Sequence, residues 1–157
     1  MAKVNIYRDK NHESTVKAIN NSKMFENNAH FLTFCAHYGV SINKRKKIKE
    51  RGIEINTKTF LNYLKDIYII ALSTVDDVTI LNDDDLIYEI FEEFANGGHI
   101  EIHKKVNKNI IRDETGMDTI LQLLAELRNK IDNIEDTEDP LALTVVNMYI
   151  YTVLDNS

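Results

Sequence analysis

Hydrophobic residues recur every three or four positions along most of the chain, which is the spacing of one face of an α-helix. This pattern predicts helices over residues 13–23, 31–38, 60–72, 86–95 and 117–131. The last stretch, residues 141–154, is rich in β-branched and aromatic residues, so a terminal helix is expected there with a strand as the alternative. The pattern therefore predicts a mainly α protein, a single domain over residues 1–157 built as a bundle of about six helices.

Polar and small residues mark the expected ends of these helices. Thr57 is the expected N-cap of the third helix, and Asp83, Asp84 and Asp85 provide the cap and favourable dipole charge for the fourth. Asp139 followed by Pro140 suits the start of the terminal segment. Gly39 is expected to end the second helix, and Asn96-Gly97-Gly98 the fourth, because glycine readily adopts the backbone conformation that closes a helix.

Two short segments carry weaker signals. Residues 41–55 read as a basic loop, in which Ile53 and Ile55 alternate around Glu54 and predict a short extended piece. Residues 99–103 fit both periods, because Ile100 and Ile102 alternate as in a strand while Ile100 and His103 are spaced as in a helix. A short extended segment near 53–55 or 99–103 is therefore consistent with the pattern.

Composition limits the number of domains and the cellular compartment that we expect for the chain. A length of 157 residues with 43% hydrophobic content is enough for one buried core. The single cysteine, Cys35, excludes an intrachain disulfide and lies within an apolar stripe, so we expect an inert core thiol in a reducing compartment. No apolar stretch approaches the roughly 20 residues of a membrane span, and the first residues lack the apolar run of a signal peptide. These features predict a cytoplasmic protein without a membrane partner.

Charge is distributed unevenly, although the formal net charge is −6. Six cations against Glu50 give residues 44–51 a charge of +5 and leave −11 for the remainder, much of it late in the chain. Such a cluster could neutralise several phosphates of a nucleic acid, whereas its ordinary role would be a solvated loop. The candidate binding residues for nucleic acid or a protein partner are Lys44, Arg45, Lys46, Lys47, Lys49 and Arg51.

Two stretches resemble a known protein family. The first is Phe34-Cys35-Ala36-His37-Tyr38-Gly39-Val40 followed by Lys44-Arg45, and the second is Ile90-Phe91-Glu92-Glu93-Phe94-Ala95-Asn96-Gly97-Gly98. Together they resemble the DNA phosphorothioation-associated protein 4 family, small proteins encoded beside bacterial DNA sulfur-modification and restriction genes in neighbourhoods that serve phage defence. The resemblance covers residues 30–105, and its signature residues are Phe91, Glu92, Glu93, Asn96, Gly97 and Gly98.

The resemblance implies a genomic neighbourhood but no particular enzymatic activity, so it identifies neither catalytic residues nor a cofactor. Residues Lys44-Arg45-Lys46-Lys47 also stand where the family pattern predicts more arginine and a proline. Adjacent residues on a helix point about 100° apart, so Glu92 and Glu93 are expected to diverge, one near a neighbouring helix and the other in solvent.

His99, Glu101 and His103 are the alternative site, because two histidines and a carboxylate could ligate a metal. Only three donors are present and the spacing is not that of a metalloprotease, so a polar surface edge is the simpler interpretation. Three hypotheses remain. The first is a non-enzymatic accessory protein of a DNA-modification or phage-defence system that binds proteins of that system, and DNA in addition, through residues 44–51. The second is a metal-dependent nuclease or hydrolase. The third is an acidic module for protein interaction or self-association, in which residues 132–139 meet a basic partner or residues 44–51 help to form a homo-oligomer.

Overall fold

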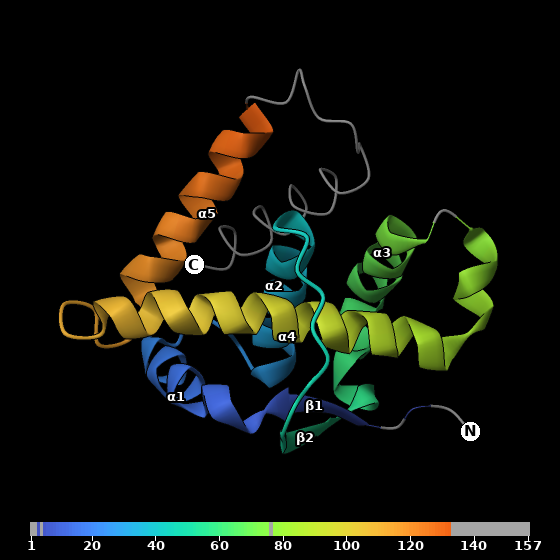
Figure 1. The fold of residues 1–157 in the computed structure, drawn as a ribbon, viewed down its shortest axis with the longest axis horizontal. Helices are drawn as coiled ribbons and strands as arrows, with labels where there is room; N and C mark the ends of the chain where they lie inside the picture. The colour runs from blue at the N-terminus through green and yellow to red at the C-terminus, as the bar shows by residue number, and fades with distance from the viewer. Residues whose placement is uncertain (1–2, 4, 76, 133–157) are drawn as a thin grey trace.

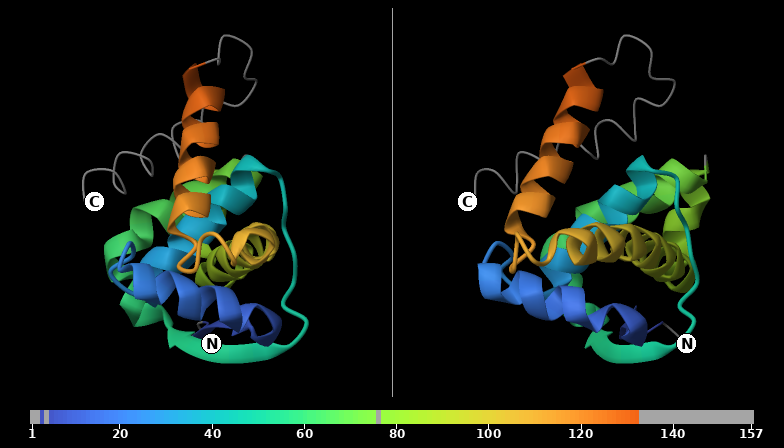
Figure 2. Two further views of the ribbon diagram at one scale, coloured as in Figure 1. Left: turned by 90° about the vertical axis from the view of Figure 1, so that its left-hand side faces the viewer. Right: turned by 60° about the vertical axis from the view of Figure 1, so that its left-hand side comes forward.

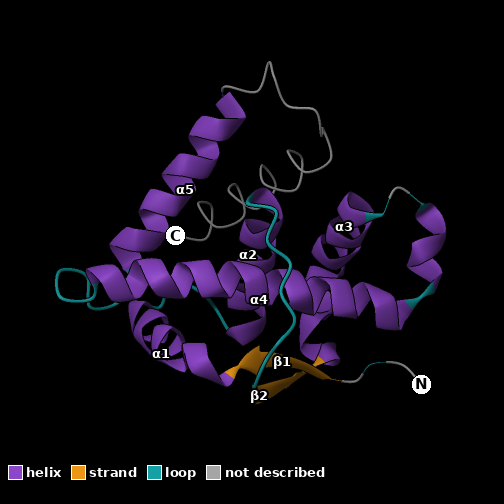
Figure 3. Cartoon of the chain, viewed as in Figure 1, coloured by secondary structure: helices purple, strands orange, loops and turns teal. Residues whose placement is uncertain are grey.

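The computed structural model describes residues 3, 5–75 and 77–132, and these form a mainly helical fold with five α-helices and one two-stranded sheet (Figure 3). The predicted mainly α class is confirmed. The terminal segment 141–154, its expected start at Asp139 and Pro140, and the acidic residues after position 132 lie outside the described residues. No helix among the described residues combines the length and the apolar character needed to cross a membrane.

The elements follow one another along the chain as β1 (Asn5–Asp9), the 3₁₀ helix η1 (Lys10–His12), α1 (Glu13–Ser22), α2 (Asn28–Ser41), β2 (Arg51–Asn56), η2 (Thr57–Tyr63), α3 (Leu64–Thr74), η3 (Val78–Asn82), α4 (Asp84–Asn109) and α5 (Met117–Asp132). The helix α4 runs through the middle of the molecule, and α1, α2, α3, α5 and β1 all contact it (Figure 1). The helix α5 leaves the end of α4 at a steep angle (Figures 1 and 2).

The core lies where α2 meets α4. Every residue of α2 from position 29 to position 39 is buried, as expected for a helix that other elements surround. Phe60 and Phe91 are fully buried and meet edge to face, with ring centroids 5.4 Å apart. Cys35 is fully buried, and burial raises the pKa of its thiol, so its predicted place in the core is confirmed.

Glycines allow α2 and α4 to approach through their main chains. A Cβ on Gly98 would overlap the carbonyl oxygen of Cys35, and one on Gly39 would overlap the carbonyl oxygen of Phe94. Neither glycine ends its helix, since α2 continues to Ser41 and α4 to Asn109. The predicted helix stops at Gly39 and at Asn96-Gly97-Gly98 were therefore wrong: Gly39 and Gly98 instead allow close packing between the two helices.

The extended segment lies at one of the two expected places. Residues 99–103 are helical, so the strand alternative there was wrong, whereas the piece at 53–55 is confirmed within β2. The strand β2 pairs antiparallel with β1, which the sequence pattern did not reveal. Ile6 lies opposite Ile55, and both are buried beneath the sheet.

The third predicted helix differs most from expectation. Residues 57–63 form η2, and the α-helix begins only at Leu64. Asn56, rather than the predicted Thr57, provides the cap, because its side chain accepts a hydrogen bond from the Lys58 N–H (2.9 Å). Leu61 belongs to the hydrophobic face that the pattern predicts to be buried in the helix over residues 60–72, but it is 63% exposed, so its predicted burial was wrong. The predicted cap at Asp83 is confirmed, since its carboxylate accepts the Leu86 N–H (3.1 Å).

Candidate functional site

Residues 44–51, here called the basic strap, cross the outside of α4. The strap leaves the end of α2, passes over α4 and enters β2 (Figure 1), and the turned views show the same path beside α4 (Figure 2). It brings the predicted basic cluster against the part of α4 that holds the family signature. Two features that the sequence presented separately therefore form one site.

The signature residues hold the main chain of the strap. The Lys46 N–H donates to the Glu93 carbonyl (3.0 Å), and the Asn96 side-chain amide donates to the Lys46 and Lys47 carbonyls (3.1 and 3.2 Å). A Cβ on Gly97 would overlap the carbonyl oxygen of Lys44, so this glycine lets the strap lie directly on the helix. The path of the strap is consequently set by main-chain contacts with one turn of α4.

Two of the six predicted binding residues are used to attach the strap. The Arg45 guanidinium donates to the carboxylate of Glu93, whose side chain is only 8% exposed. Lys44 donates to Glu101, which also pairs with Lys104 (3.0 Å). The hydrogen bond from Lys44 is the main reason that the pKa of Glu101 is lowered. Lys44 and Arg45 are thus each paired with a carboxylate of α4, although their side chains remain 41% and 36% exposed.

A third predicted binding residue, Arg51, lies over an aromatic ring. Its guanidinium carbon is 4.6 Å from the centroid of Tyr7, within the range of a cation–π interaction. This contact joins the start of β2 to β1 beside the strap.

The other three predicted residues present their charge to solvent. Lys46, Lys47 and Lys49 are exposed, and none of them forms an ion pair with a residue that the structure describes. The main chain at Lys49 is nevertheless held, since its N–H donates to the Asp9 carboxylate (3.1 Å). The strap therefore presents three free ammonium groups from a fixed backbone.

Glu92 and Glu93 diverge as predicted, but neither carboxylate is left to solvent. Glu93 pairs with Arg45 on the strap, whereas Glu92 accepts the Tyr7 N–H (2.8 Å) and the Lys3 ammonium (2.9 Å). Expecting one of the two in solvent was wrong, because β1, which the pattern did not predict, packs beside α4.

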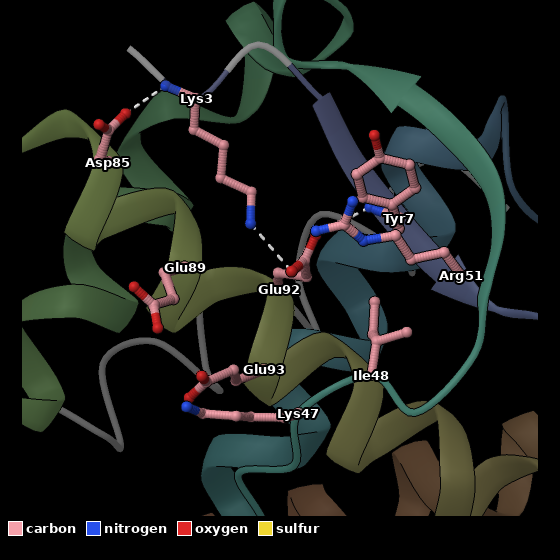
Figure 4. Close-up of a pocket in the computed structure, with 9 residues that line it drawn as sticks. All are labelled: Lys3, Tyr7, Lys47, Ile48, Arg51, Asp85, Glu89, Glu92 and Glu93. Carbon is pink, nitrogen blue, oxygen red and sulfur yellow. Dashed lines mark hydrogen bonds and ion pairs between the residues drawn. The ribbon is translucent and has the colours of Figure 1, made fainter. Parts of the chain in front are cut away.

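A cavity of about 450 Å³ opens on the Glu92 side of the strap. Figure 4 shows Glu92 between Lys3 and Tyr7 at its walls. Its walls carry four carboxylates against three cations, which gives a mixed lining with a slight acidic excess. The lining residues are Lys3, Tyr7, Lys47, Ile48, Arg51, Asp85, Glu89, Glu92 and Glu93.

A second cavity, of about 340 Å³, lies between the strap, α4 and η1, and is here called the lysine cavity. Its walls contain all three free lysines of the strap and a single carboxylate. The lining residues are Asp9, Asn11, His12, Lys46, Lys47, Lys49, Asn96 and Ile100. The sequence did not single out Asp9, Asn11 or His12, because their approach to the strap depends on the pairing of β1 with β2.

The structure does not gather His99, Glu101 and His103 around one point, although the rings of His99 and His103 both lie against the ring of His12, with centroids 5.2 and 5.0 Å away. His99 is 1% exposed and lies edge-on to Phe31, and burial lowers its pKa to about 3. His103 instead hydrogen-bonds Thr15 (2.6 Å), while Glu101 binds Lys44. Placing His99 on a polar surface edge was wrong. Among the described residues, no three histidine, cysteine or acidic side chains are grouped so that they could hold a metal ion.

These contacts give the signature residues a physical role, and the comparison with known proteins agrees with the resemblance. A family model described as DNA sulphur modification system-associated protein 4 matches residues 5–143. The chain belongs to this family. The match extends beyond residues 30–105 and includes β1, α1 and all of α5. No curated protein and no solved structure matches the chain. Association with a DNA sulphur modification system is consistent with an accessory role in that system.

Proposed function

We propose that this protein is a non-enzymatic accessory component of a bacterial DNA-modification and phage-defence system, and that it binds the phosphate backbone of DNA, next to a protein partner, through the basic strap. One observation carries the proposal: α4 holds the main chain of the strap while Lys46, Lys47 and Lys49 remain exposed and unpaired among the described residues. Because the main chain of the strap is already held, only the lysine side chains lose conformational freedom when they meet a row of phosphates.

The number of free cations supports an accessory role. Each phosphate that a protein neutralises on duplex DNA contributes about −0.9 to the slope of log K against log salt, so three lysines give a slope near −2.7. The remaining surface is acidic, with a formal net charge of −6 for the whole chain, and it repels DNA. The strap alone therefore gives weak, salt-sensitive binding, and a partner bound to the same DNA supplies the remaining affinity.

The decisive experiment compares two triple variants of equal charge. The strap variant carries Lys46→Gln, Lys47→Gln and Lys49→Gln, and the control carries Lys17→Gln, Lys58→Gln and Lys65→Gln at exposed lysines elsewhere. Fluorescence anisotropy with a labelled duplex measures the slope of log K against log salt. The salt is varied between roughly 50 and 200 mM, the range in which the loss of phosphate contacts lowers the affinity measurably. The proposal predicts a slope flatter by about 2.7 for the strap variant and little change for the control. Equal losses in both variants would show that only net charge matters and would refute a DNA site on the strap.

A pull-down from the native bacterium tests the partner. The tagged wild-type protein and both variants are incubated with lysate, with and without nuclease. Capture of modification or restriction proteins after nuclease treatment supports a protein-mediated accessory role. Loss of every captured protein with nuclease leaves DNA binding alone, and the partner part of the proposal is then wrong.

A further inference from the structure

The lysine cavity differs from its neighbour in charge. Its three lysines face one carboxylate, Asp9, which gives a local charge of about +2. Burial opposes ionisation of Asp9, but hydrogen bonds from the Asn11 and Lys49 N–H groups outweigh it and lower its pKa, so Asp9 is ionised at neutral pH. Burial lowers the pKa of His12, which is therefore neutral. The excess suits a dianion, whereas the cavity of Figure 4 repels one.

Asn96, one of the residues that line the cavity, also carries an unpartnered acceptor. Asn96 is 4% exposed, and its amide nitrogen is committed to the Lys46 and Lys47 carbonyls, which fixes the orientation of the side chain. The remaining Oδ1 atom is buried and accepts no hydrogen bond from any residue that the structure describes. Leaving a buried acceptor unsatisfied costs about 1–3 kcal/mol. The atom is sealed from solvent, so a hydroxyl or amino donor of a ligand reaches it only when the strap yields as the cavity fills, and the hydrogen bond then removes that cost.

The cavity is large enough for more than a small inorganic anion. Its volume of about 340 Å³ is in the range of small-molecule sites. Ile100, which is half-buried, adds an apolar wall. The occupant therefore needs an apolar part in addition to an anionic group and a hydrogen-bond donor.

We propose that the lysine cavity binds a nucleoside phosphate, with the phosphate on Lys46, Lys47 and Lys49, the sugar or base against Ile100, and a hydroxyl or amino hydrogen on Asn96 Oδ1. The ligand is either a free nucleotide or one nucleotide of a nucleic-acid strand. This inference goes beyond the proposed function, because a nucleotide fills the cavity whether or not duplex DNA lies along the strap.

The first test uses the unaltered full-length protein, labelled with ¹⁵N and observed by NMR. Adenosine monophosphate, adenosine, inorganic phosphate and a short single-stranded oligonucleotide are titrated separately. The proposal predicts that adenosine monophosphate shifts the NMR signals of the Asn96 side-chain amide and the Ile100 backbone amide. Adenosine, which lacks the phosphate, should bind at least about tenfold more weakly than adenosine monophosphate. Shifts with the oligonucleotide but not the free nucleotide identify a strand as the source. Absence of these shifts with both, or equal binding of inorganic phosphate, overturns the proposal.

A variant separates this proposal from the DNA-binding one. Ile100→Trp fills the cavity but leaves the three lysines in place, so it should abolish nucleotide binding and preserve the salt slope with duplex DNA. Lys49→Gln should weaken nucleotide binding by at least about tenfold, whereas Lys65→Gln, at an exposed site on α3, should not. Nucleotide binding unaffected by Ile100→Trp would place the ligand elsewhere and overturn the proposal. If Ile100→Trp lost duplex binding but kept nucleotide binding, the proposed function would be contradicted as well, because the three lysines are still in place.

Discussion

Gly98→Ala tests the close approach of α2 and α4. Inside a helix with open surroundings, alanine is more stable than glycine by about 1 kcal/mol. At Gly98 the new methyl group would overlap the Cys35 carbonyl oxygen and lie 2.9 Å from the Gly39 nitrogen. Both neighbours are main-chain atoms that cannot rotate away, so the helices must separate. Overpacking of this kind costs about 1–3 kcal/mol, and occasionally more. We expect the free energy of unfolding to fall by about 2 kcal/mol, near the upper part of that range less the gain in helix propensity.

Urea unfolding followed by circular dichroism measures this change, and a loss of 2 kcal/mol should lower Tm by about 4–8 °C in a chain of this size. The matched control is the pair Glu89→Gly and Glu89→Ala, at an exposed position of the same helix where the methyl group meets solvent. There alanine should exceed glycine by about 1 kcal/mol. If Gly98→Ala stabilised the protein by a similar amount, the two main chains would not be in contact and the helix crossing described above would be wrong.

Two further predictions concern pH and the strap. The pKa of His99 is lowered to about 3 against an ordinary 6.5, so between these values the unfolded chain takes up a proton that the folded protein refuses. The free energy of unfolding should therefore fall as pH drops below 6.5, by about 1.4 kcal/mol per pH unit and by about 2.7 kcal/mol in total at pH 4.5. Urea titrations at several pH values should show that the free energy of unfolding depends less steeply on pH in His99→Leu than in the wild type. An unchanged dependence would mean that His99 is not the group responsible. Asn96→Ala removes two hydrogen bonds to the strap, so the Lys46 amide should exchange its hydrogen faster than in the wild type. Amides in the middle of α2 should keep their protection. Unaltered exchange at Lys46 would show that Asn96 does not hold the strap.

Helical periodicity predicted most of the fold because each of these helices buries one face against its neighbours. The strand β1 was missed for a physical reason. Its inward-facing positions are Ile6 and Arg8, so a cation occupies a position where a strand pattern normally shows a hydrophobic residue. Arg8 is buried because its guanidinium donates to Asn28 (2.9 Å) and Glu13 (3.1 Å). A sequence pattern cannot show such partners, since they come from two different helices.

The signature glycines were misinterpreted for a related reason. A pair such as Gly97-Gly98 suits the end of a helix and equally suits the surface where another main chain touches it. Only the position of Cys35 and Lys44 in space separates these meanings. The basic cluster was recognised from composition, but its division into anchoring and exposed residues depends on acidic partners about fifty residues away along the chain, Glu93 and Glu101.

Main-chain contacts set the path of the strap, whereas its side chains set its charge. The groups that position residues 46 and 47 on α4 are an amide N–H and two carbonyls, which every residue except proline possesses in full. Replacing Lys46 or Lys47 by arginine, glutamine or glutamate would leave those contacts intact, and a proline would be excluded only at position 46, where the N–H is needed. Related chains could therefore keep one scaffold and change what the strap recognises one side chain at a time, as an antibody framework carries different loops.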